Sequence, residues 1–173
     1  MKNTETTNSG NKISVADVWK LLERVVDPEI PVLNVVEMGI VRDVKISDEG
    51  KVEVIITPTY SGCPAMRTIE EDIEAVLKEK FITHYSFHTI LSPAWTTDWM
   101  TDEAREKLQS YGVSPPQKGS ADKNLLIGRL KEVKCPRCSS TNTQMISQFG
   151  STACKSLYKC DACLEPFDYF KCI

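Results

Sequence analysis

The chain has 173 residues, of which 41% are hydrophobic and 26% are charged, with a formal net charge of -3. This is the composition of a globular protein, and the absence of an apolar run near ~20 residues excludes a membrane-spanning segment. The length allows one medium-sized domain and a small module that cannot fold on a hydrophobic core alone.

The two ends of the chain differ in character. The polar N-terminus lacks the apolar core of a secretory signal, so we expect residues 1–13 to form a disordered tail and the protein to be cytoplasmic. Residues 1–116 hold 12 basic and 19 acidic side chains, whereas residues 117–173 carry a net charge of +4. An acidic main domain argues against a phosphate-binding surface there.

The first predicted element is a helix. Hydrophobic residues recur at helical spacing over residues 15–26, and Ser14 followed by Asp17 predicts an N-terminal cap. Pro28 disfavours a helical conformation in the residue before it, so the helix should end near Asp27.

The next elements alternate between strands and helices. Residues 44–46 and 52–56 alternate hydrophobic with polar side chains around a polar turn, which predicts a hairpin. Helical spacing returns at residues 66–77, and residues 84–91 form a third predicted strand. Thr101 then caps a short helix that ends at Gly112. Its expected buried face consists of Ala104, Leu108 and Tyr111.

This order predicts an α/β (α+β) domain over residues 14–112. It should contain a small three-stranded mixed sheet with packed helices in α-β-β-α-β-α order, since the last strand crosses over through the second helix. Residues 113–130 contain prolines and glycines without a clear period and are predicted to be a linker. Residues 131–173 then form a zinc-ribbon-like metal module.

That module rests on two C-x2-C pairs, Cys135 with Cys138 and Cys160 with Cys163. Such turns point both sulfurs at one ion, and two of them complete a tetrahedral thiolate site. The segments 143–149, 155–159 and 167–170 have the length and aromatic content of ribbon strands.

Two metals fit these ligands. Zinc would replace the hydrophobic core that so short a module cannot supply. An iron-sulfur centre or a transferable metal could be held by the same sulfurs. Cys154 and Cys172 lie outside the pairs; we expect Cys172 to pack beside Phe170, and Cys154 is open between packing and ligation.

Some zinc ribbons bind nucleic acid. Here residues 131–173 hold six basic and four acidic side chains, a modest excess. The aromatic residues near the C-terminus could be core as easily as stacking platforms, so nucleic-acid binding is a minor alternative.

Cys63 precedes Pro64 at the predicted start of the second helix. Free backbone N–H groups and the positive end of the helix dipole would favour a thiolate there, which suits a reactive or metal-binding cysteine; a buried cap residue is the other reading. Asp27 and Glu29 could supply ligands or hydrogen bonds nearby, or could only cap their loop. No catalytic base is placed beside Cys63, since His84 and His88 share one strand face.

Several motifs resemble the iron-sulfur cluster assembly factors, and the C-terminal motifs narrow the resemblance to the PaaD family, whose members are associated with multicomponent phenylacetyl-CoA epoxidase. These motifs lie at residues 27–31, 38–41, 57–64, 92–99, 149–155 and 165–172.

The resemblance implies a non-catalytic accessory or maturation factor for the metal centre, an iron-sulfur one, of this oxygenase in aerobic phenylacetate catabolism. Its partners would be oxygenase or reductase subunits, and the functional positions would be Cys63, Asp27 and Glu29. Iron or an iron-sulfur cluster would be held transiently, beside zinc in the ribbon. The alternatives are a structural component of the complex without metal transfer, a thiol enzyme and a nucleic-acid-binding ribbon.

Overall fold

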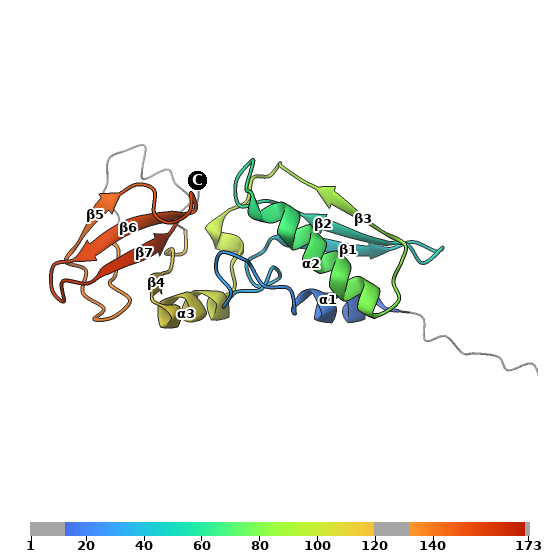
Figure 1. Cartoon of the computed structure of the whole chain (residues 1–173), viewed down its shortest axis with the longest axis horizontal. Coiled ribbons are helices and arrows are strands. Elements are labelled where there is room, and N and C mark those ends of the chain that lie inside the picture. Colours follow the sequence, from blue (N-terminus) through green and yellow to red (C-terminus); the bar gives the residue numbers. More distant parts are fainter. Residues whose placement is uncertain (1–12, 120–131, 172–173) are drawn as a thin grey trace, which may run out of the picture.

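The computed structural model describes residues 13–119 and 132–171. Two β-sheets lie at opposite ends of the molecule, and helix α3 lies between them (Figure 1). Residues 1–12 of the expected tail, most of the expected linker and Cys172 lie outside the described residues. No helix in the described segments is long and apolar enough to cross a membrane.

The first sheet is the predicted three-stranded mixed sheet, in the order β1-β2-β3. Strands β1 and β2 are antiparallel, and β3 is parallel to β2 because α2 connects them. Helices α1 and α2 pack together on this sheet, and the prediction of its fold is confirmed. The elements are α1 (Val15–Leu22), β1 (Val41–Ile46), β2 (Val52–Ile56), α2 (Ala65–Glu79) and β3 (Tyr85–Thr89).

Helix α1 begins with the predicted cap but ends early. The Ser14 hydroxyl accepts a hydrogen bond from the Asp17 N–H, and the Asp17 carboxylate accepts one from the Ser14 N–H. The helix ends at Leu22 and not near Asp27. The chain becomes extended sooner because residues 25–27 pair with residues 33–35, which closes the acidic loop between them.

The third helix, α3 (Asp102–Tyr111), is capped by Thr101 and ends at Gly112 with φ +93°, as predicted. A short 3-10 turn, η1 (Thr97–Trp99), precedes it. The prediction for Tyr111 was wrong: Leu108 is fully buried, but Tyr111 is 52% exposed. Tyr111 is the last residue of the helix and lies beyond its packed turns.

The second sheet has the order β4-β7-β6-β5. Strands β5, β6 and β7 lie where ribbon strands are predicted. Strand β4 lies at the start of the expected linker, yet it pairs in parallel with β7. The chain therefore enters the ribbon sheet directly after α3. The strands are β4 (Val113–Ser114), β5 (Thr143–Ser147), β6 (Lys155–Cys160) and β7 (Pro166–Phe170).

One hydrophobic core joins the two sheets. Phe170 at the end of β7 is fully buried in the cluster formed by α1, α2 and the first sheet, and Cys154 belongs to the same cluster. The Trp95 ring meets Phe170 edge-on at 6.0 Å, while its indole N–H donates to the Met38 carbonyl at 3.0 Å. The ribbon is therefore packed against the first unit and not merely tethered to it.

Candidate functional site

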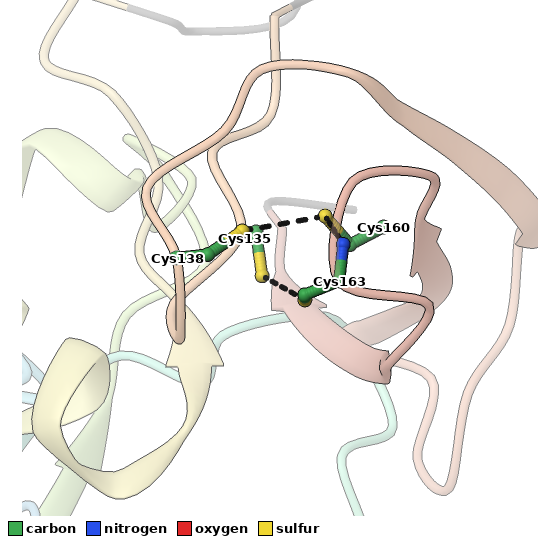
Figure 2. Close-up of side chains that lie close together, drawn as sticks. All are labelled: Cys135, Cys138, Cys160 and Cys163. Atoms are coloured by element: carbon green, nitrogen blue, oxygen red, sulfur yellow. Dashed lines mark hydrogen bonds between the residues drawn. The ribbon is translucent and has the colours of Figure 1, made fainter.

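The four sulfurs of the C-x2-C pairs meet at one end of the ribbon. Their Sγ atoms all lie within 4.8 Å of one another, with Cys135 and Cys163 at 3.7 Å and Cys138 and Cys160 at 3.5 Å (Figure 2). The turn after Cys135 is closed by hydrogen bonds between Cys135 and residues 139 and 140. These local turns bring together all four residues predicted as metal ligands.

The spacing of the sulfurs suits a tetrahedral metal ion. A metal–sulfur distance of about 2.3 Å gives tetrahedral edges of about 3.8 Å, close to the observed separations. The Cys163 N–H lies 3.5 Å from the Cys160 sulfur, and together with the Ala162 N–H it lowers the pKa of the Cys160 thiol to about 7. The donor set therefore matches a resident ion such as zinc.

The acidic loop is built around Asp27. Its Oδ1 accepts hydrogen bonds from the N–H groups of Glu29 and Ile30, each at 2.8 Å, which shapes the turn between the two prolines. The Asp27 side chain is only 6% exposed, and burial raises the pKa of its carboxyl although the two N–H groups oppose this. Asp27 thus caps the loop, and the Glu29 carboxylate remains for other contacts.

Cys63 lies just before α2. Gly62, with φ +88°, turns the chain so that the Cys63 N–H donates to the Tyr60 carbonyl at 3.2 Å. Pro64 is the N-cap of α2, so Cys63 precedes the cap by one residue. The Cys63 side chain is half-buried against the main core, which leaves its thiol partly accessible.

The ribbon brings a second thiol to the acidic loop. The Cys154 sulfur lies 3.6 Å from Glu29 Oε2 and 3.0 Å from the Thr152 hydroxyl. The neighbouring Lys155 ammonium donates to the Glu29 carbonyl at 3.3 Å. Burial raises the pKa of the Cys154 thiol to about 11, so this thiol is protonated at neutral pH.

Tyr60 lies beside both thiols. Burial, together with the charges of Cys63, Glu29 and Cys154, raises the pKa of Tyr60 to about 12. Tyr60 also lines an open groove of about 410 Å³ between the loop of residues 57–61 and the segment of residues 91–95. The groove gives a route from solvent to the neighbourhood of Cys63.

The sequence signal for Cys63, Asp27 and Glu29 was local, whereas that for Cys154 was absent. Cys154 stands outside both C-x2-C pairs, and nothing in its own segment points to the acidic loop. Tyr60 and Lys155 were missed for the same reason. Only the packing of Phe170 on Trp95 brings these side chains together.

Both parts of the chain match known families. Residues 15–81 match the model of the iron-sulfur cluster assembly proteins, and residues 119–171 match that of the PaaD zinc beta ribbon domain. A solved domain of unknown function, DUF59 from Bacillus anthracis, has a TM-score of 0.51 and 26% identity. It covers 54% of this chain, and the match takes in 90% of that domain.

Short relatives match the first part. An Fe-S protein maturation auxiliary factor of Porphyromonas gingivalis is 34% identical over 53% of this chain and 88% of its own length. The auxiliary factor SufT of Staphylococcus aureus is 36% identical over 52% of this chain and 99% of its own length. Fold, cysteine cluster and these matches define the class: an iron-sulfur assembly domain joined to a four-cysteine ribbon.

A further relative spans both parts. It is a 1,2-phenylacetyl-CoA epoxidase subunit of Escherichia coli K12, which is 51% identical over 92% of this chain and 93% of its own length. The chain therefore belongs to the PaaD family.

Proposed function

We propose that this protein is a cytoplasmic accessory factor that matures the iron-sulfur centre of a multicomponent phenylacetyl-CoA epoxidase. In this role Cys63 holds iron or a cluster transiently. Asp27 shapes the acidic loop and Glu29 faces the pocket. The factor then passes its cargo to an oxygenase or reductase subunit and has no turnover chemistry of its own.

The observation that carries this proposal is the placement of Cys63. A half-buried thiol beside Tyr60, next to an open groove and near a carboxylate, can bind a metal and release it again. A thiol enzyme would need a base near this thiol. The chain's two histidines, His84 and His88, are exposed, and neither hydrogen-bonds to a group of this site within the described residues.

The ribbon supports this role in a different way. Its four closely spaced sulfurs suit a resident zinc ion that stabilises the small module. Strand β5 also exposes Met145 and Ile146, which are 50% and 55% accessible, and Phe149 follows at 57%. Exposed apolar side chains of this kind suit contact with a client protein.

The test is maturation of the client in cells that produce the epoxidase components. Wild-type protein or Cys63→Ser is coexpressed with them, and the iron and acid-labile sulfide of the purified components are measured with epoxidase activity. Cys63→Ser should keep its fold and ribbon metal but yield components without their iron-sulfur centre. Full maturation by Cys63→Ser would sink the proposal.

The exposed apolar residues of β5 also favour a second candidate, a structural component that only holds the oxygenase complex together. This candidate predicts that Cys63→Ser is silent. It also predicts that replacing Met145 and Ile146 by Lys abolishes copurification with the other subunits. A maturation factor would instead lose client iron in Cys63→Ser while copurification persists.

A further inference from the structure

We propose that Cys154 is a second thiolate ligand for the iron that Cys63 holds, so that the two units of the chain form the cargo site jointly. The inference rests on the proposed function, because it assumes that Cys63 binds iron. It assigns to the ribbon a task beyond holding its own metal ion.

The ribbon holds Cys154 firmly against the first unit. The Cys154 carbonyl accepts the Lys171 N–H at 2.9 Å, which ties it to the end of β7. Phe170, next to Lys171, is fully buried and packs edge-on against Trp95. The position of the thiol is therefore set by the hydrophobic core and not by a loose loop.

The surroundings of Cys154 are those of a ligand. A cysteine that only fills space needs no charged partner, yet the sulfur of this 94%-buried thiol lies 3.6 Å from the Glu29 carboxylate. The contact joins residues that are 125 positions apart and come from different units. Thiolate and carboxylate together form a donor set that binds first-row transition metals.

Cys63 lies within the same packed cluster. Both Cys63 and Cys154 contact the core that joins the sheets, and both affect Tyr60. Among the described residues only the four ribbon sulfurs form a set of three or more ligands within 4.8 Å, so the Cys63, Cys154 and Glu29 atoms lie further apart. A half-buried Cys63 can rotate about its Cα–Cβ bond to close this set, and an open set suits a cargo that must leave again.

Binding is balanced without any redox step. Ferrous iron displaces one proton from each of the two thiols, and both protons pass to solvent. The resulting two iron–thiolate bonds and one bond to the Glu29 carboxylate give the site a single negative charge. Coordination positions remain for a ligand from the client, which gives a route for transfer.

This site requires the ribbon. The short relatives from P. gingivalis and S. aureus are matched over most of their length by about half of this chain, so they have no counterpart of the ribbon. A second thiol beside the acidic loop is thus a property of the joined architecture.

The test is anaerobic titration of the zinc-loaded full chain with ferrous iron, followed by thiolate-to-iron absorption and equilibrium dialysis. Cys154→Ser should weaken ferrous binding at least about tenfold, as expected for loss of a group at a metal site, while the zinc content is unchanged. Ser156→Ala is the matched control, because it alters a buried side chain of the same strand and removes no ligand. It should bind iron as wild type does.

Parallel titration of Cys63→Ser separates the two proposals. Loss of binding in Cys63→Ser with wild-type affinity in Cys154→Ser would overturn only the role of Cys154. Wild-type affinity in Cys63→Ser would overturn the proposed function itself. Should Cys154→Ser fail to fold, X-ray absorption at the iron edge of the wild type decides: two sulfur neighbours support the inference, and one or none overturns it.

Discussion

The Trp95 ring meets the ring of Phe170 edge-on, with centroids 6.0 Å apart, and this contact joins the two units of the chain. Phe170 is fully buried. Phe170→Ala should therefore lower the free energy of unfolding by about 3–5 kcal/mol, because it leaves a cavity in the shared core. Denaturant unfolding measures the loss. Phe149→Ala, at a side chain that is 57% exposed, should change stability by less than about 0.5 kcal/mol. Similar losses in the two variants would contradict a shared core.

Gly39 lies where only glycine fits. Its φ is +71°, and a Cβ there would come within 2.8 Å of the Trp99 Cβ and 2.9 Å of the Trp99 carbonyl oxygen. Gly50 has φ +82° but open space around it. Gly50→Ala should cost about 1 kcal/mol for the left-handed backbone, and Gly39→Ala about 1–3 kcal/mol more for the overlap. Equal losses in thermal or denaturant unfolding would rule out the steric argument.

Asp27 should make the protein less stable as pH rises. Burial raises the pKa of its carboxyl above the ordinary 3.8, so the folded state binds the proton more tightly than the unfolded state does. Stability is therefore lost as pH rises from about the ordinary value through the raised value, and it stays lost above it. Asp27→Asn keeps an oxygen for the Glu29 and Ile30 N–H groups and removes this term.

We therefore expect Asp27→Asn to gain on the wild type between pH 4 and pH 7. Urea unfolding of both proteins at the two pH values measures the difference, in which other titrating groups largely cancel. A variant that falls behind the wild type as pH rises would show that the charged carboxylate is stabilised in the folded protein.

The ribbon should depend on its metal ion. Cys160→Ser removes one of four ligands, so the zinc content should fall from about one ion per chain, and the ribbon strands should lose their order. Metal analysis and hydrogen exchange of β5, β6 and β7 measure both effects. Cys63→Ser should keep its zinc and its exchange protection. Ordered ribbon strands in zinc-free Cys160→Ser would mean that the hydrophobic core suffices.

The two thiols near the acidic loop should react at different rates. Cys154 is 6% exposed, and its pKa of about 11 leaves about one thiol in a thousand ionised at pH 8. Cys63 is half-buried and should be alkylated first, as peptide mass mapping of metal-free sites can follow. Phe170→Ala should accelerate labelling of Cys154 by loosening the ribbon. Equal initial rates at the two cysteines would mean that the thiol of Cys154 is accessible in the native state.

Much of this molecule follows from local sequence. The capping box of α1, the hairpin of β1 and β2 and the ribbon strands depend on side-chain periodicity and turn residues within a few positions. The four metal ligands follow from two C-x2-C pairs, since each pair bends its own backbone toward one ion. Cys63 and the acidic loop were found from proline positions and from resemblance to a family.

Tertiary structure alone decided the rest. Helix α1 ends early because residues 25–27 pair with a segment further along the chain, and β4 forms because β7 offers it a free edge. The contact of Cys154 with Glu29 spans 125 residues and requires Phe170 to seat against Trp95. Periodicity and spacing report on neighbours along the chain, whereas such a contact depends on how two folded units bury their apolar surfaces together.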